Sequence, residues 1–337
     1  MAADTVRLAS FDTELSRDGP GLLLRDILRG EDPQVLAVIE VIREAAADIL
    51  LLQGIDFDAD AQTLMALLNN LAQAGAPYPY FVHLRPNTGE PTGLDINRNG
   101  RFGEPRDAQG YGRFNGADGI ALLSRYPIDY DQVLDFSHHL WADVPGSTAP
   151  QVLPAAALGV QRLAQIASWD VPILLPQGTV LHILATGASP PVFDGPEDRN
   201  GLRNADELRF WQLYLDSAEF DADHFALMGT LNLDPDKGEG RREVMRALLN
   251  DPSLQDPIPV SAGAARAGAP ADTADWDEPV PGNLRVDYIL PAAGLTVLNA
   301  GVLWPEDEAQ PPGIAVVERA SRHRLVWVDV GEPIAVP

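Results

Sequence analysis

Cysteine is absent from the 337 residues, and lysine occurs once, at Lys237. The lack of cysteine excludes disulfide bonds, cysteine-ligated zinc and thiol catalysis, and it leaves oxidising and reducing compartments both open. Basic residues are scarce, with 24 Lys and Arg against 49 Asp and Glu, so the net charge is −25. This balance disfavours a nucleic-acid groove that works by bulk charge, because such grooves release counterions with clustered Lys and Arg.

Long apolar runs are also missing. No stretch approaches the roughly 18 residues of a membrane span, so no membrane span is expected. The amino terminus lacks a basic segment followed by an apolar one, so no signal peptide is expected in this chain. Hydrophobic residues make up 45% and charged residues 22%, a composition that supports a packed core.

Short apolar runs alternate with amphipathic segments along the chain. Asp32 and Pro33 form an N-cap followed by proline, and the apolar residues after them recur at helical spacing. We predict strands over 5–11, 48–52, 119–124, 180–186, 225–229, 285–290 and 324–330, and helices after Asp32 and over 61–74, 204–215 and 241–249. Because no linker divides the chain, we expect a single domain over 1–337, with a long loop at 87–118 and a surface excursion at 261–282.

Six stretches spread over nearly the whole chain form a recognisable series. They are RLASFDTEL at 7–15, DILLLQGIDFD at 48–58, GIALLSRYPI at 119–128, GTLNLDPD at 229–236, RVDYILP at 285–291 and SRHRLVWVDV at 321–330. Together they resemble the endonuclease/exonuclease/phosphatase superfamily, whose fold is DNase-I-like. The resemblance implies an α/β fold, a four-layer sandwich of two packed mixed β-sheets flanked by helices. It also implies a metal-dependent phosphoesterase that uses Mg or Mn on a phosphoester or nucleic-acid substrate.

The stretch at 190–211 is similar to a bacterial, often exported, subset of this superfamily. This similarity implies a periplasmic or extracellular protein, with the cytoplasm still open. We expect a monomer.

Four positions depart from the family's catalytic pattern. The metal-binding Glu falls at Gly54, the first catalytic His at Gly187, the Asp of the GDxNxDP-type motif at Thr230, and the Asp that orients the last His at Arg322. Loss of one oxyanion donor already slows catalysis about 10²- to 10³-fold. We therefore expect an impaired or inactive site.

Several family positions are retained or nearly so. Asn232, Asp287 and His323 match the pattern, and Asp12 stands where the family usually has Asn. The apolar strand residues and the turn residues around all these positions are intact in the sequence. The substitutions therefore affect catalytic positions and not the residues expected to maintain the fold.

An alternative is an active enzyme with a shifted ligand set. Asp12, Asp56, Asp58 and Asp234 all lie near predicted strand ends, where carboxylates can gather a metal. The same residues are also common as caps and turn formers. Likewise, a His323 without its orienting Asp is expected to be a buried, satisfied histidine rather than a working acid.

The loop at 95–107 matches the first half of a calcium loop. Asp95, Asn97 and Asn99 stand at positions 1, 3 and 5, Gly100 at the turn, and the Arg101 carbonyl at position 7. Arg106 replaces the closing Glu, and Asp107 follows it by one step. We predict either a structural calcium site or a turn held by its own side-chain hydrogen bonds, which also leaves open a third hypothesis, a calcium-organised exported interaction protein.

Overall fold

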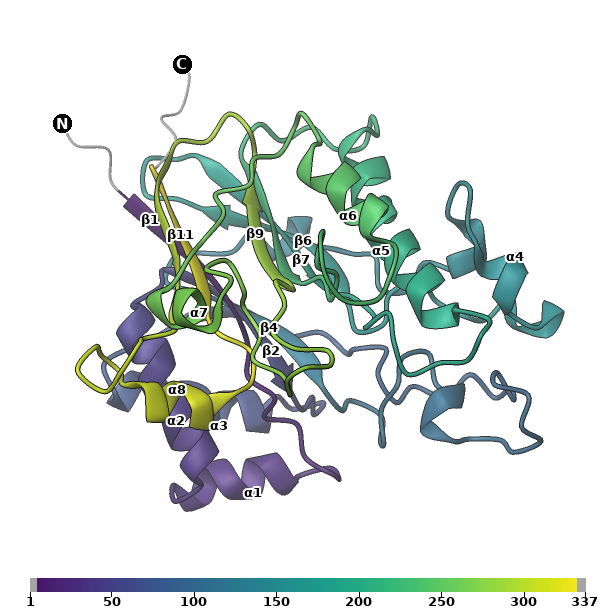
Figure 1. The fold of residues 1–337 in the computed structure, drawn as a ribbon, viewed down its shortest axis with the longest axis horizontal. Coiled ribbons are helices and arrows are strands. Elements are labelled where there is room, and N and C mark those ends of the chain that lie inside the picture. Colours follow the sequence, from purple (N-terminus) through teal and green to yellow (C-terminus); the bar gives the residue numbers. More distant parts are fainter. Residues whose placement is uncertain (1–4, 332–337) are drawn as a thin grey trace.

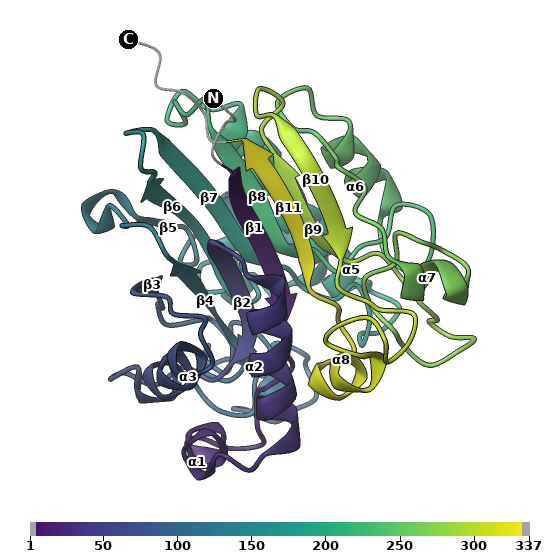
Figure 2. The same cartoon turned by 90° about the vertical axis from the view of Figure 1, so that its left-hand side faces the viewer.

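Two β-sheets form the centre of the computed structural model, which describes residues 5–331 (Figures 1 and 2). The first sheet contains β1 (Thr5–Asp12), β2 (Ile49–Ile55), β3 (Tyr80–Val82), β4 (Gly119–Ser124), β10 (Val297–Val302) and β11 (Val326–Gly331), in the order β10-β11-β1-β2-β4-β3. The second contains β5 (Leu134–Asp135), β6 (Ser168–Leu174), β7 (Val180–Gly187), β8 (Phe225–Thr230) and β9 (Asp287–Pro291), in the order β5-β6-β7-β8-β9. Both sheets are mixed, because β1 pairs in parallel with β2 and β7 with β8, whereas the other pairs are antiparallel.

Alternation along β1 explains how the first sheet is covered. Val6 and Leu8 belong to the core between the sheets, whereas Ala9 and Phe11 pack with the helices on the outer face. The inner row continues into the polar residues Ser10 and Asp12, and Gln53 takes the matching place at the end of β2. The apolar core between the sheets therefore gives way to polar side chains at this edge.

Helices cover both outer faces, so the molecule has four layers (Figure 2). The Asp32 carboxylate accepts hydrogen bonds from the amides of Gln34 and Val35, which confirms the predicted N-cap. The helices α1 (Leu22–Arg29), α2 (Pro33–Ala45), α3 (Gln62–Gln73) and α8 (Ile314–Ala320) pack on the first sheet, and α5 (Arg199–Leu215) and α6 (Arg242–Leu249) on the second. Two short helices, α4 (Ala149–Val152) and α7 (Ala262–Ala267), lie outside these layers.

The predicted fold class is confirmed, and every strand predicted from the sequence is present, β4 with the predicted bounds and the others with shifted ones. β2 extends to Ile55, β9 begins at Asp287, β11 begins at Val326 and α5 begins at Arg199, and α7 occupies part of the predicted excursion. The segment 87–118, all of which is described, is a long loop with one short 3-10 helix, η1 (Pro105–Asp107). Within residues 5–331, no helix has both the length and the apolar character needed to cross a membrane.

Candidate active site

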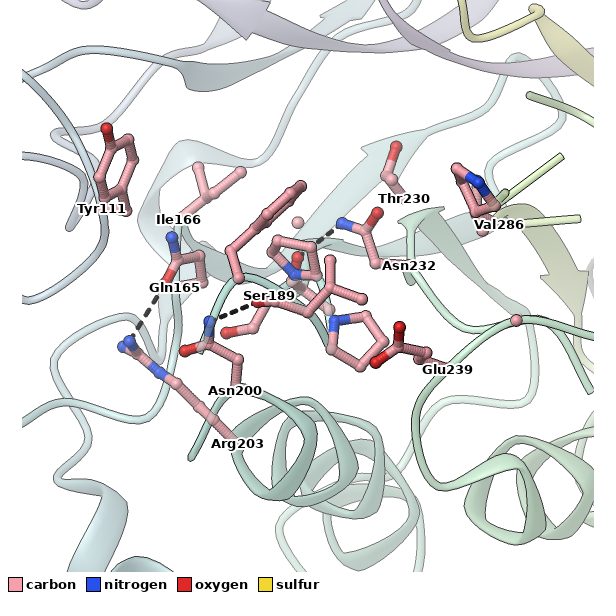
Figure 3. Close-up of a pocket in the computed structure, with 18 of the residues that line it drawn as sticks. Tyr111, Gln165, Ile166, Ser189, Asn200, Arg203, Thr230, Asn232, Glu239 and Val286 are labelled. Atoms are coloured by element: carbon pink, nitrogen blue, oxygen red, sulfur yellow. Dashed lines mark hydrogen bonds between the residues drawn. The ribbon is translucent and has the colours of Figure 1, made fainter. Parts of the chain in front are cut away.

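A cavity of about 790 Å³ opens at the edge where the parallel strands end (Figure 3). The carboxyl ends of paired parallel strands meet at one sheet edge, so Asp12 lies beside Gln53 and Gly187 beside Thr230. The cavity brings together Asp12, Gly187, Thr230, Asn232, Arg322 and His323, all of which the sequence singled out. In Figure 3, Thr230 and Val286 lie at one end of the cavity, and Tyr111 and the hydrogen-bonded pair Arg203–Gln165 at the other.

His323 has an orienting carboxylate, contrary to the expectation from Arg322. Its Nδ1 lies 2.9 Å from Oδ2 and 3.1 Å from Oδ1 of Asp287, and its Nε2 lies 4.0 Å from Oδ2 of Asp12. The carboxylate comes from β9, not from the neighbouring position 322, because Asp287 is the first residue of that strand and faces the loop before β11. Burial alone would lower the pKa of His323, but Asp287 and Asp12 outweigh it and raise the pKa to about 9.

Asp287 is itself held by hydroxyl groups. Thr230 Oγ1 donates to its Oδ1 at 2.6 Å, and Thr273 Oγ1 donates to its Oδ2 at 2.8 Å. The amide of Gln53 joins this network from the other sheet, since its Nε2 donates to Thr230 Oγ1 and its Oε1 accepts from the Thr230 amide, both at 3.0 Å. Thr230 thus acts as a neutral link where the family pattern has a carboxylate.

The backbone at Gly54 has no room for a side chain. Gly54 has a φ of +74°, and the pairing of β2 with β4 shifts register between Gln53 and Ile55, as at a β-bulge. A Cβ at this position would lie 2.6 Å from the Glu14 amide nitrogen and 2.8 Å from Oδ1 of Asp12. The change from Glu to Gly is therefore accompanied by a backbone that disfavours any L side chain.

Arg322 binds the carboxylate of Glu14, whose backbone amide lies against Gly54. Its Nε donates to Glu14 Oε1 at 2.9 Å, and its backbone amide donates to Oε2 at 2.8 Å. Burial alone would raise the pKa of Glu14, but the hydrogen bonds from Arg322 reverse the direction and lower it. Glu14 was missed in the sequence because it follows Asp12 in an ordinary strand-to-loop segment.

Gly187 is the last residue of β7, and a substituent there would meet a side chain and not the backbone. A Cβ there would lie 2.9 Å from Cδ1 of Ile166, the end of a flexible side chain, so this position tolerates a substituent more readily than Gly54. Nearby, Asn232 has a φ of +56° and its Nδ2 donates to the Ala188 carbonyl at 2.9 Å. Asn232 is thus a cavity-lining residue that also fixes the turn after β8.

Two carboxylates that line the cavity, Asp12 and Asp118, have raised pKa values. Burial raises the pKa of Asp12, and His323 partly opposes this shift. Burial, together with the charges of Asp12, Asp56 and Glu14, raises the pKa of Asp118 to about 7. Asp118 was missed in the sequence because a single Asp before Gly119 is typical of a turn.

The shifted ligand set is only partly supported by the geometry. Asp56 accepts hydrogen bonds from Ser16 and from two backbone amides, and Asp58 caps α3 through both oxygens. Asp234 accepts two backbone amides in the turn after β8 and the Arg285 amide just before β9. These three residues therefore form turns and caps. Asp12 and Asp234 both line the cavity, and Oδ2 of Asp12 lies 4.0 Å from Nε2 of His323.

The donor set does not reproduce the metal site that the family implies. Among residues 5–331, no group of three or more His, Asp or Glu side chains is arranged to hold a metal ion. The family's Glu position is a bulge glycine, and Glu14 is bound to Arg322. Asp12 and Asp118 are the carboxylates that line the cavity beside this point.

The loop at 95–107 is held by its own polar side chains. Asp95 accepts from the amides of Asn99 and Gly100, Asn97 accepts from Asn99, and the Asn99 side chain accepts from the Arg101 amide. Asp107 accepts from the amides of Ile96 and Glu104. The structure thus contains the predicted hydrogen-bonded turn, and calcium binding stays a prediction.

Comparison with known proteins identifies the family. No curated protein matches the chain. Among solved structures, similar ones are endonuclease/exonuclease/phosphatase proteins from Beutenbergia cavernae (19% identity, TM-score 0.58, 97% of this chain and 71% of that chain), Leptotrichia buccalis (15%, 0.54, 96% and 99%) and Bacteroides thetaiotaomicron (13%, 0.55, 99% and 98%). At these identities they show the shared fold. The model of the Endonuclease/Exonuclease/phosphatase family matches residues 26–323, and the chain belongs to that family.

Proposed function

We propose that this chain binds a phosphoester in its cavity and hydrolyses it poorly or not at all. The observation that carries the proposal is the bulge at Gly54, where a Cβ would approach the Glu14 amide to 2.6 Å. A lost side chain alone is easily restored, but here the backbone has a conformation that disfavours the metal-binding Glu. The position therefore lacks both the ligand and the geometry for it.

The same cavity offers cationic donors for a phosphoester. With a pKa of about 9, His323 is an imidazolium at neutral pH, so it donates a proton or a hydrogen bond and does not act as a base. Its Nε2 lies on the Asp12 side of the cavity, and Arg322 also lines the cavity while its Nε donates to Glu14. Charge-assisted hydrogen bonds of this kind bind phosphate oxygens without requiring catalysis.

Hydrolysis and binding must be measured separately. We would assay plasmid DNA and bis(p-nitrophenyl) phosphate with Mg²⁺, Mn²⁺ or Ca²⁺ and with EDTA, and would measure binding of phenyl phosphate by calorimetry. We expect no turnover above the EDTA control and measurable binding that weakens in His323→Gln. Turnover that EDTA abolishes and that Asp12→Asn removes would overturn the proposal. Absence of binding would overturn the ligand-binding part of it.

A second candidate is an active metal-dependent phosphodiesterase or nuclease that uses Asp12 and Asp118. Clustered carboxylates with raised pKa values are typical of functional sites as well as of structural networks. This candidate predicts Mg²⁺- or Mn²⁺-dependent turnover that falls at least about 10²-fold in Asp118→Asn. Wild-type turnover with an unchanged rate in Asp118→Asn would exclude this ligand set.

A further inference from the structure

Four arginines line the cavity, and one of them, Arg203, lies at the end opposite Thr230 (Figure 3). Two of the four are committed, since Arg322 binds Glu14 and Arg203 donates to the backbone carbonyls of Leu163 and Ala164 among others. Two more arginines, Arg106 and Arg199, line the same cavity, and neither guanidinium makes a hydrogen bond or ion pair with any residue in 5–331. The chain has twice as many acidic as basic residues, so an arginine without a carboxylate partner is unexpected.

The surroundings of Arg199 leave its charge uncompensated by any direct contact. Burial lowers its pKa, and the nearby charge of Arg106 lowers it further. Glu197, Asp194 and Asp107 raise it from a distance. None of these carboxylates has a hydrogen bond or ion pair with Arg199. Glu197 accepts the Gly195 amide, Asp194 accepts the Asn200 amide, and both oxygens of Asp107 accept backbone amides of the loop. A half-buried cation without a partner is unfavourable, and a bound anion is the group that would relieve it.

Separate, well-fixed elements position the two arginines. Arg199 is the first residue of the 17-residue helix α5, one turn before Arg203, so both lie on the helix face that borders the cavity. Arg106 lies within η1, whose ends are joined by reciprocal hydrogen bonds between Glu104 and Asp107. The positive end of the α5 dipole adds to the attraction for an anion at this place. The hydrogen-bonded loop at 95–107 therefore has a consequence for the cavity, because it presents Arg106 there.

We propose that Arg106 and Arg199 form a subsite for a second anionic group of the cavity ligand, of phosphate or sulfate geometry. This inference rests on the proposed function, in which the first phosphoester group lies at the His323 end. The lining of the cavity is largely apolar and includes Ile166, Pro190 and Leu153. The ligand class is thus a compound with two anionic groups joined by an uncharged segment. Paired guanidinium groups suit a tetrahedral oxyanion, since each presents several donors in fixed directions.

Calorimetry with matched ligands tests the subsite. The probes are hexyl phosphate and 1,6-hexanediol bisphosphate, with inorganic phosphate, sulfate and acetate as separate arms. We expect the bisphosphate to bind the wild type at least about tenfold more tightly than the monophosphate, and Arg199→Gln to remove most of that preference. Arg106→Gln is expected to have a smaller effect, because its side chain is exposed. Arg29→Gln, an exposed arginine at the end of α1, is the matched control and should change nothing.

The variants separate a failed subsite from a failed function. Arg199→Lys keeps the charge and should retain part of the preference if the variant folds, as circular dichroism would verify. Equal binding of the two ligands by the wild type, or an unchanged preference in Arg199→Gln, would overturn the subsite. Acetate binding as tightly as phosphate would overturn its oxyanion geometry. Metal-dependent hydrolysis of the monophosphate would instead overturn the proposed function, and a loss of bisphosphate preference in Arg199→Gln would still support the subsite.

Discussion

Substitution of Gly54 gives the sharpest test of the reasoning about the active site. Gly54→Ala adds one Cβ at a φ of +74°, 2.6 Å from a backbone nitrogen. The left-handed conformation costs an L residue about 1–2 kcal/mol, and overpacking of a well-packed site costs about 1–3 kcal/mol. Because the nearest atom belongs to the backbone, the contact is not relieved by a rotamer change. We therefore expect the free energy of unfolding to fall by about 2–5 kcal/mol.

Gly75 provides a matched control for the backbone contribution. It has a φ of +88°, it is exposed after α3, and a Cβ there would meet no atom within 4 Å. Gly75→Ala should therefore lose only the conformational part, about 1–2 kcal/mol. The assay is urea denaturation of wild type and both variants at pH 7, with the midpoints compared at a common slope. A Gly54→Ala variant no less stable than Gly75→Ala would refute the close contact.

The result also decides how activity can be restored. If Gly54 is as constrained as described, a variant that restores Glu, His, Asp and Asp at 54, 187, 230 and 322 should be destabilised and should gain little hydrolytic activity. High activity in a stable variant would show that the bulge rearranges once the side chains return.

Three further predictions concern the charges. First, Asp118 has a pKa of about 7 in the folded protein, well above its unfolded value, so the stability of the wild type should fall as the pH rises from about 4 to about 7. In Asp118→Asn the melting temperature should depend less on pH over that range. An unchanged pH profile of the melting temperature in the variant would contradict the shift. Second, Arg322→Ala should lower the free energy of unfolding by less than about 1 kcal/mol, because the ion pair of Arg322 with Glu14 is partly exposed. The same change releases the Glu14 carboxylate, so the Mn²⁺ affinity measured by paramagnetic resonance should rise. An unchanged Mn²⁺ affinity would count against Arg322 as the group that blocks Glu14. Third, if the loop at 95–107 binds calcium, millimolar Ca²⁺ should raise the melting temperature of the wild type but not of Asp95→Ala, whereas equal shifts in both would place the effect elsewhere.

Much of the fold was predictable because its apolar periodicity is regular. The strands that carry the site alternate cleanly or are apolar on both faces, and parallel pairing then places their polar ends together. The predictions failed where polar residues face inward. The first turn of α5 was missed because Arg203 and its neighbours are buried against the cavity wall, so no apolar stripe marks them. β6 was missed because Asp170 and Pro172 interrupt a buried strand.

The site was predictable in its residue types and not in its geometry. The resemblance to the family implied the substituted positions 54, 187, 230 and 322. The orienting role of Asp287 depends on a contact between residues 36 positions apart, and the bulge at Gly54 depends on how β2 pairs with β4. Spacing within one motif contains neither kind of information. The unpaired arginines were equally hidden, because only the packed structure shows which cations have no partner.

The double hydrogen bond between Gln53 and Thr230 has a mechanical consequence. It joins the two sheets at the floor of the cavity through both ends of one amide group, and the core beneath it is apolar and closely packed. Sliding of one sheet over the other would break both bonds at once, so the floor should move as one body with both sheets. Any opening that admits a large ligand must then come from the walls, namely the segments around Tyr111, Phe193 and Val280 that stand exposed above the floor.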